Sequence, residues 1–268
     1  MKIVVCIKQV PATGADKRYT DDLRLDRASV EAIINPLDEY AIEQALRLVD
    51  DGTVDQVTYL SMGPEQASEA LRRALAMGGD DAVLVTDAAL AGADEWATAK
   101  VLAAALDKLA PDVALMGMAS DDARGSLVPG AVAAMRDLPL LSYGSELKLT
   151  DGEARVRRLS ATGFDWIAAP LPVVATVTDQ VGEPRYASLK GIMAATAPGT
   201  SEPRASSEAI PIRATSGASL SSAAARTLAV AHSSAPASAA SVTRTASSPP
   251  IASARRRASE ACSGPIDR

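Results

Sequence analysis

Aromatic residues and histidine are scarce in this sequence, and their scarcity limits both its core and its chemistry. Phe, Trp and Tyr make up 3% of the 268 residues, so Ala, Val, Leu and Ile must fill the core of a chain that is 47% hydrophobic. The only histidine, His232, lies in a C-terminal segment that we expect not to fold. The folded part therefore offers no imidazole for a catalytic triad, a metal site or a general base.

Cysteine, net positive charge and long apolar runs are also lacking. Cys6 and Cys262 lie at opposite ends of the chain, away from any zinc-ligand spacing, so we expect no disulfide framework, no metal and a reducing, cytoplasmic location. The formal net charge of −6 disfavours a partner with a phosphate backbone, so we expect no nucleic acid. No apolar run approaches the roughly 18–20 residues that insertion into a membrane requires. Residues 1–8 are too short for a signal peptide and predict a first strand.

Short apolar runs alternate with amphipathic stretches over the first half of the chain, which is typical of a mostly parallel α/β sheet. The predicted strands cover residues 2–8, 54–62, 82–87 and 112–118. The predicted helices lie near residues 38–48, 65–77, 94–109 and 127–136. The fold class is therefore α/β, with an open Rossmann-like sheet and helices on both of its faces.

After Pro139 the pattern becomes rich in β-strand formers. Strands are predicted near residues 140–149, 155–160 and 171–177, with hairpin chemistry at Asp151-Gly152. We expect these strands to be antiparallel additions to the sheet. Residues 183–193 are too short and too interrupted for a core element, so they either leave the domain to touch another surface or cap it.

From Thr196 onward the composition changes abruptly. Residues 196–268 contain no lysine and no aromatic residue, eight arginines, four acidic residues and long runs of Ala, Ser, Pro and Thr. Few large apolar side chains are available to offset the entropy of ordering, so we expect a disordered tail. The run Arg255-Arg256-Arg257 fits a solvated tail better than a nucleic-acid patch. The predicted domains are thus residues 1–195 and a low-complexity tail, residues 196–268.

Three predicted strands end in loops that could bind a ligand: residues 8–14, 61–64 and 117–130. In an open parallel sheet, ligands bind at the carboxyl ends of strands, and phosphates favour helix N-termini. Residues 35–38 begin another helix and could close the same crevice. The chain has no Walker A, GxGxxG or Ser-Gly-Gly phosphate loop. From the residues alone, these segments are either ligand contacts or ordinary loops and turns.

Several segments, in order and with similar spacing, resemble the β subunit of electron transfer flavoproteins over residues 1 to about 195. They are VCIKQVP at 5–11, NPLDEYAIE at 35–43, SMGP at 61–64, RALAMG at 73–78, LPVV at 171–174 and EPRYASLKGIMAA at 183–195. The resemblance implies a fold like that of the adenine nucleotide α-hydrolases. It also implies a heterodimer, in which an α subunit holds most of an FAD and the β subunit buries an AMP.

The resemblance also implies site residues. The cofactor-binding candidates are Cys6, Asn35, Pro36, Leu37, Asp38, Met62, Asp122, Gly125, Ser126 and Val128. The candidates for partner binding are Tyr186, Leu189, Ile192 and Met193, in a segment that matches the family's recognition loop for acyl-CoA and related dehydrogenases. A leucine buried by such a partner contributes roughly 1.5–3 kcal/mol. No residue of the chain is assigned a catalytic role, because the flavin performs the redox chemistry.

Two other functions remain open on the residues. One is a flavin-free nucleotide-binding regulatory or stress protein that works as a homodimer on the same fold. The other is an adenylating or pyrophosphate-forming hydrolase, which the missing Ser-Gly-Gly loop disfavours.

The chain departs from the family pattern at several positions. Leu127 stands where many relatives have a glutamine, so a contact there must use the backbone, and Thr13-Gly14 replaces an aromatic residue that some relatives place beside the flavin. The tail matches none of the family's Lys-rich C-terminal arm. A GC-rich gene read out of frame would give such a tail, so we hypothesise a frameshift, which sequencing the locus in close strains would test.

Overall fold

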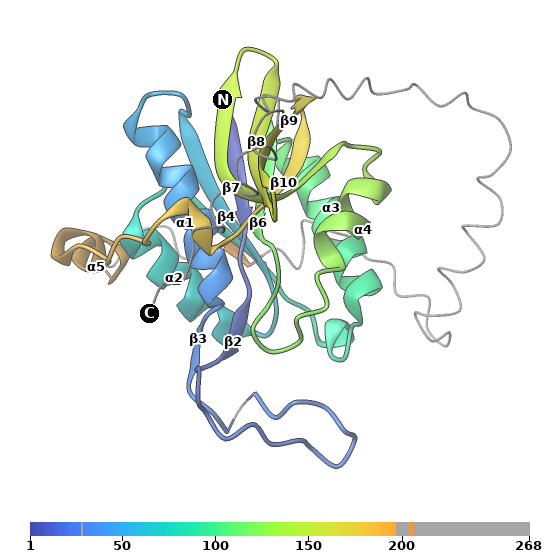
Figure 1. Cartoon of the computed structure of the whole chain (residues 1–268). Coiled ribbons are helices and arrows are strands. Elements are labelled where there is room, and N and C mark those ends of the chain that lie inside the picture. Colours follow the sequence, from blue (N-terminus) through green and yellow to red (C-terminus); the bar gives the residue numbers. More distant parts are fainter. Residues whose placement is uncertain (28, 197–203, 206–268) are drawn as a thin grey trace, which may run out of the picture.

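A computed structural model of the chain describes residues 1–27, 29–196 and 204–205 (Figure 1). Within these residues one large sheet is built from strands in the spatial order β11 (Arg204–Ala205), β5 (Asp81–Val85), β4 (Gln56–Met62), β1 (Lys2–Cys6), β6 (Val113–Gly117), β10 (Val173–Val177), β7 (Leu140–Thr150), β8 (Glu153–Ser160) and β9 (Gly163–Pro170). A separate antiparallel hairpin pairs β2 (Gln9–Pro11) with β3 (Ala32–Ile34). This hairpin and the loop between its strands extend away from the sheet (Figure 1).

Helices cover both faces of the sheet, and a further helix lies outside them. They are α1 (Pro36–Asp50), α2 (Ser68–Met77), α3 (Glu95–Leu109), α4 (Val128–Met135) and α5 (Leu189–Thr196), with short 3₁₀ turns at Glu65–Ala67, Ala88–Leu90 and Asp179–Val181. Helices α1 and α2 lie on one face of the sheet, and α3 and α4 lie on the opposite face (Figure 1). Helix α5 packs against α2.

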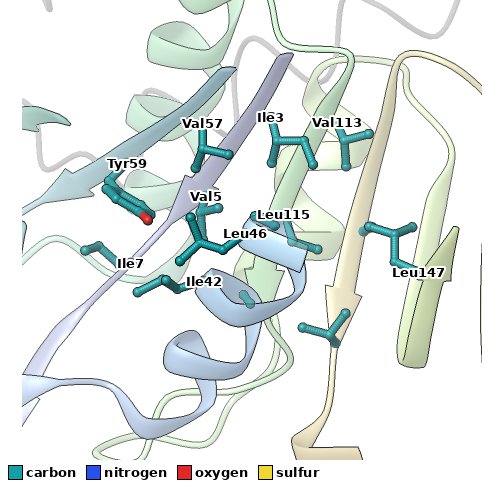
Figure 2. Close-up of a cluster of buried hydrophobic side chains, with 14 of the residues drawn as sticks. Ile3, Val5, Ile7, Ile42, Leu46, Val57, Tyr59, Val113, Leu115 and Leu147 are labelled. Atoms are coloured by element: carbon teal, nitrogen blue, oxygen red, sulfur yellow. The ribbon is translucent and has the colours of Figure 1, made fainter. Parts of the chain in front are cut away.

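The two faces of β1 supply two separate hydrophobic clusters, because successive side chains of a strand point in opposite directions. Ile3 and Val5 pack in the cluster that includes α1 and α2, and Val4 and Cys6 pack in the cluster that includes α3 and α4. Figure 2 shows the first cluster, in which Ile42 and Leu46 of α1 lie over the strands. Burial on both faces explains why the central strands read as continuous apolar runs.

The strands and helices predicted before residue 137 are confirmed, and α1 begins slightly earlier than expected, at Pro36. The antiparallel pairing predicted after Pro139 is correct for the contacts of β8 with β7 and β9. It is wrong for β10, which lies between β6 and β7 and pairs with both in parallel. All five residues of β10 are buried, as in any strand with neighbours on both edges and helices or loops on both faces.

The chain also forms elements that the sequence did not predict: the β2–β3 hairpin, strand β9, helix α5 and strand β11. The last of these belongs to the segment expected to be disordered, and it pairs in parallel with the edge strand β5, whose outer backbone groups accept a partner. The rest of the tail, with His232 and Cys262, lies outside the described residues. Within them, no helix is long and apolar enough to cross a membrane, and the cytoplasmic location stays a prediction.

Candidate functional site

A cavity of about 380 Å³ opens where the strand order reverses. From β1 the chain proceeds outward to β4 and β5 on one side, and it then returns to place β6 on the other side of β1. A crevice therefore forms between the carboxyl ends of β1 and β6, which is where open α/β sheets bind their ligands. The volume lies within the usual range for small-molecule sites.

The floor of the cavity is apolar. Cys6, Met62 and Met116 from the ends of three neighbouring strands line it together with Leu102 of α3. Burial raises the pKa of the Cys6 thiol, so this group stays protonated and behaves as a small hydrophobic side chain rather than a nucleophile. Such a floor suits a flat, weakly polar ring.

Asn35 ties helix α1 to the loop that follows β6. It occupies the N-cap position of the helix, but its side chain makes no capping hydrogen bond. Instead, its amide group donates to the carbonyl oxygen of Ala119 over 2.8 Å, and its Oδ1 accepts the backbone N–H of Asp121 over 2.9 Å. Because Asn35 is buried, these bonds fix one wall of the cavity to the start of the helix.

Asp38 joins the ends of the two strands that flank the crevice. Its Oδ2 accepts the backbone N–H of Lys8 over 2.8 Å, and its Oδ1 accepts that of Gly117 over 3.2 Å. Burial raises the pKa of this carboxyl group to about 7, although the hydrogen bonds from Lys8, Asn35 and Gly117 act in the opposite direction. A titratable group thus lies at the base of the cavity.

Two cations meet one carboxylate at the polar end of the cavity. Lys8 Nζ lies 2.8 Å from Asp122 Oδ1, and Arg27 Nη2 lies 2.5 Å from Oδ2 of the same group, whose side chain is 2% exposed. Burial alone would raise the pKa of Asp122, but the hydrogen bonds from Lys8 and Arg27 outweigh it and lower the pKa to about 2. Lys8 also donates to Ser120 Oγ over 3.3 Å.

The loop before α4 directs a helix N-terminus at the cavity. Arg124 and Ser126 both have a left-handed backbone with φ of 53°, which turns the chain sharply into the helix. Leu127, Val128 and Pro129, at the start of α4, line the cavity, and no side chain caps this end. The N–H groups of a first helical turn have no partner within the helix and carry partial positive charge.

Seven of the ten residues predicted to bind the cofactor line this cavity: Cys6, Asn35, Asp38, Met62, Gly125, Ser126 and Val128. The other three, Pro36, Leu37 and Asp122, do not line it. Leu37 lies against Gly117, and Asp122 forms ion pairs with Lys8 and Arg27, which do line the cavity. Whether these residues contact a ligand stays a prediction.

The sequence did not single out Arg27, Ser120, Asp94 or Glu95, all of which line the cavity. Arg27 lies in the loop of the β2–β3 hairpin, 95 positions from its partner Asp122, and no local sequence pattern predicts such a contact. Asp94 caps the N-terminus of α3 through the N–H of Ala97, a role that its position as the first residue of a predicted helix could have indicated.

The four residues predicted to bind a partner lie on a different surface. Tyr186 is 96% exposed and Leu189 is 75% exposed, and Ile192 and Met193 of α5 are exposed as well. We call these four residues the docking surface. Four large apolar side chains exposed within eight positions are unusual for a surface without a partner.

Comparison with known proteins gives the family. The electron transfer flavoprotein domain matches residues 22–207. The chain is 40% identical over 192 residues to the electron transfer flavoprotein subunit beta of Thermoanaerobacterium thermosaccharolyticum, a match that covers 72% of this chain and 74% of the relative. The chain belongs to the electron transfer flavoprotein family. Its function is that of a β subunit, an electron carrier, which is the first of the three functions that the residues left open.

Other relatives of this electron transfer flavoprotein chain carry names that link them to a caffeyl-CoA reductase and an acryloyl-CoA reductase. The Caffeyl-CoA reductase-Etf complex subunit CarD of Acetobacterium woodii is 39% identical over 194 residues, 72% of this chain and 74% of the relative. The Acryloyl-CoA reductase electron transfer subunit gamma of Anaerotignum propionicum is 39% identical over 197 residues, 72% of this chain and 73% of the relative.

Proposed function

We propose that the cavity between β1 and β6 holds AMP, and that the chain pairs with an electron transfer flavoprotein α subunit to carry electrons from acyl-CoA and related dehydrogenases. The observation that carries the AMP assignment is the arrangement of the cavity, with an apolar floor at one end and Lys8 and Arg27 at the other. An adenosine monophosphate has the same polarity along its length.

The residues of the cavity fit each part of AMP. The apolar floor of Cys6, Met62, Leu102 and Met116 suits the adenine ring. The uncapped start of α4 offers backbone N–H groups to the phosphate, as helix N-termini do. Lys8 and Arg27 share a single carboxylate, so their pair retains a net positive charge for an anion.

We further propose that FAD is held mainly by the α subunit, where the two chains meet. The names of the family and of the β subunit relatives support a flavin in the complex. When bound, FAD accepts and passes on the electrons. In this proposal the present chain supplies no acid, base or nucleophile; its residues hold the adenylate, shape the interface and present the docking surface.

The docking surface is proposed to receive the dehydrogenase. Leu189 is its proposed anchor: it is an aliphatic side chain, 75% exposed, in the segment that resembles the family's recognition loop, and it would lose contact with water on entering an apolar pocket. One anchor of roughly 1.5–3 kcal/mol suits a transient electron-transfer encounter with a small interface. The reductase names of the relatives support partners that act on acyl-CoA.

The nucleotide content of the complex tests the AMP proposal. The full chain is co-expressed with an electron transfer flavoprotein α subunit, and the bound nucleotides are released with acid and identified by mass. We expect one AMP and one FAD per heterodimer. Recovery of two FAD molecules and no AMP would show that the cavity holds a dinucleotide, and protein without nucleotide would refute the proposal.

Leu189→Ala tests the docking proposal. We expect slower reduction of the heterodimer by an acyl-CoA dehydrogenase at limiting concentrations, with unchanged AMP and FAD content, because Leu189 does not line the cavity. Rates equal to those of the wild type would remove the anchor role.

A further inference from the structure

Glu43 of α1 is a buried carboxylate with an unusually complete set of donors. Its side chain is 5% exposed. Each carboxylate oxygen accepts two hydrogen bonds: Oε2 accepts the backbone N–H of Arg185 over 3.0 Å and its Nε–H over 2.8 Å, and Oε1 accepts Arg47 Nε–H over 2.7 Å and Arg185 Nη2–H over 3.3 Å. Burial alone would raise the pKa of Glu43, but the hydrogen bonds from Arg185 and Arg47 outweigh it and lower the pKa, so the group is ionised at neutral pH.

The two arginines extend this contact into a network that fixes residues 181–185 on α1. Arg47 Nη1 donates to the carbonyl oxygen of Val181, and Arg185 Nη2 donates to Asp50 over 2.8 Å. Gly182 between them has a left-handed backbone with φ of 112°, and a Cβ atom there would lie 2.9 Å from the Arg47 guanidinium. The segment therefore lies directly against the Arg47 guanidinium at this glycine.

A second close contact lies beyond the start of α5. A Cβ atom on Gly191 would lie 2.1 Å from the carbonyl oxygen of Ala76, at the end of α2. The N–H of Gly191 donates to Ser188 Oγ over 2.9 Å, which closes the first turn of the helix. Tyr186 and Leu189 of the docking surface thus lie between a contact with α1, at Arg185, and a contact with α2, at Gly191, and Ile192 and Met193 follow the second contact directly.

The ion pair between the buried Glu43 and Arg185, whose side chain is 33% exposed, contributes more to geometry than to stability. Removing two charges from water costs free energy that their attraction only partly returns, whereas a bidentate arginine fork accepts one arrangement of its partner. Arg185 directly precedes Tyr186, the first residue of the docking surface. Fixing its backbone and its side chain on one carboxylate therefore limits the orientations that the next residues can adopt.

We propose that Arg185, through Glu43, is a positioning residue for electron delivery: it holds the docking surface in the arrangement that the dehydrogenase recognises. This inference rests on the proposed docking function of Leu189 and its neighbours. A surface that is arranged before the encounter binds more tightly than one that the partner must order, because the binding-competent fraction multiplies the affinity. Arg185 itself does not need to contact the partner.

Hydrogen–deuterium exchange on the full chain, co-purified with an α subunit, tests the positioning directly. Arg185→Ala should speed the exchange of the amides of residues 186–193 about tenfold, while the amides of β1 and β6 keep their protection. Arg185→Lys keeps the positive charge but loses the two-pronged guanidinium contact with Glu43, so it should speed the exchange of these amides by an intermediate factor. If the alanine variant does not fold, the lysine variant tests the positioning role. Arg155→Ala, which removes an exposed arginine paired with Glu153 on β8, is the matched control and should change neither region.

Kinetics with an acyl-CoA dehydrogenase as the probe test the consequence. For Arg185→Ala the KM for the heterodimer should rise roughly three- to tenfold, as expected if the arranged fraction falls to between a third and a tenth, with kcat unchanged. Glu43→Gln should have a similar effect, and the double variant should be no worse than the stronger single variant, because both act through one contact.

The outcomes separate this inference from the proposal on which it rests. If Leu189→Ala raises KM, whereas Arg185→Ala and Arg185→Lys change neither the exchange of residues 186–193 nor KM, the positioning role is overturned. Additive effects of Glu43→Gln and Arg185→Ala would also overturn it. If Leu189→Ala leaves KM unchanged, the docking function fails, and faster exchange without a change in KM then leaves Arg185 a purely structural residue.

Discussion

The Asp38 carboxylate lies where a side chain on Gly117 would have to go. A Cβ atom on Gly117 would be 2.4 Å from Asp38 Oδ1 and 2.7 Å from the carbonyl group of Leu37. The same Oδ1 accepts the N–H of Gly117. The end of β6 can therefore reach the first turn of α1 only as glycine, and this approach closes the base of the cavity.

Gly117→Ala should destabilise the domain by about 1–3 kcal/mol, because neither a buried carboxylate nor a helix backbone can move aside at little cost. It should also reduce the AMP that is recovered with the protein. Urea denaturation and nucleotide analysis measure the two effects. Gly130→Ala, in helix α4, is the control. A Cβ atom on Gly130 would lie 3.9 Å from Leu140 Cδ2, an ordinary contact, so this substitution should be neutral or stabilising. Equal stability of the two variants would contradict the close approach.

Lys8→Gln and Arg27→Gln should each weaken AMP binding about tenfold or more, because hydrogen bonds to charged groups contribute roughly 1.5–3 kcal/mol. Calorimetric titration of nucleotide-free protein with AMP measures the effect. Arg18→Gln removes an exposed arginine from the same hairpin loop and serves as the control. Adenosine, which lacks the phosphate, should bind all four proteins with similar affinity. A loss for adenosine as large as that for AMP would place the two cations away from the phosphate.

Asp122 should stabilise the domain only above the pH range in which it titrates. Its pKa falls from 3.8 to about 2 on folding, so the folded chain binds fewer protons and the stabilisation, present above about pH 5, is lost as the pH falls through 4 towards 2. After allowance for solvent around the two cations, it amounts to about 1–2 kcal/mol. The difference in unfolding free energy between wild type and Asp122→Asn should therefore shrink between pH 6 and pH 3.5 in guanidinium titrations. A constant difference would mean that charge has no part in it.

Asp38 should have the opposite pH dependence. Burial raises its pKa from 3.8 to about 7, so the folded chain binds the additional proton between these values. Its contribution is most favourable below about pH 4 and is lost as the pH rises through 7. The stability of the wild type relative to Asp38→Asn should thus fall between pH 5 and pH 8. An increase over that range would indicate that the two backbone N–H donors outweigh the burial.

The position of the cavity could be predicted from the sequence, because it depends on the order of strands and helices. The alternating pattern places residues 8, 62 and 117 at strand ends, and Asn35 begins a helix beside them. The roles of individual side chains could not be predicted. The bonds of Asp38 to Gly117 and of Asn35 to Asp121 span 79 and 86 positions, and only the folded chain brings these partners together.

The central, parallel position of β10, which was predicted to be antiparallel, is consistent with its residues. All five residues of β10 (VVATV) are buried, as are those of β6, whereas β8 has buried residues only at Ala154 and Val156, between partly or fully exposed ones. The first pattern favours a central strand and the second an antiparallel strand with one exposed face. Helix α5 has Leu189, Ile192 and Met193 at helical spacing, but it is only eight residues long and contains Gly191, so its pattern is too short to identify a helix.

The central place of β10 also has a consequence for biosynthesis. Until residue 177 has left the ribosome, β6 and β7 each present an open edge, and the sheet exists as two unconnected pieces. A nascent or truncated chain that ends before Val173 would keep both edges available for pairing with other chains, so such products should aggregate instead of binding a nucleotide.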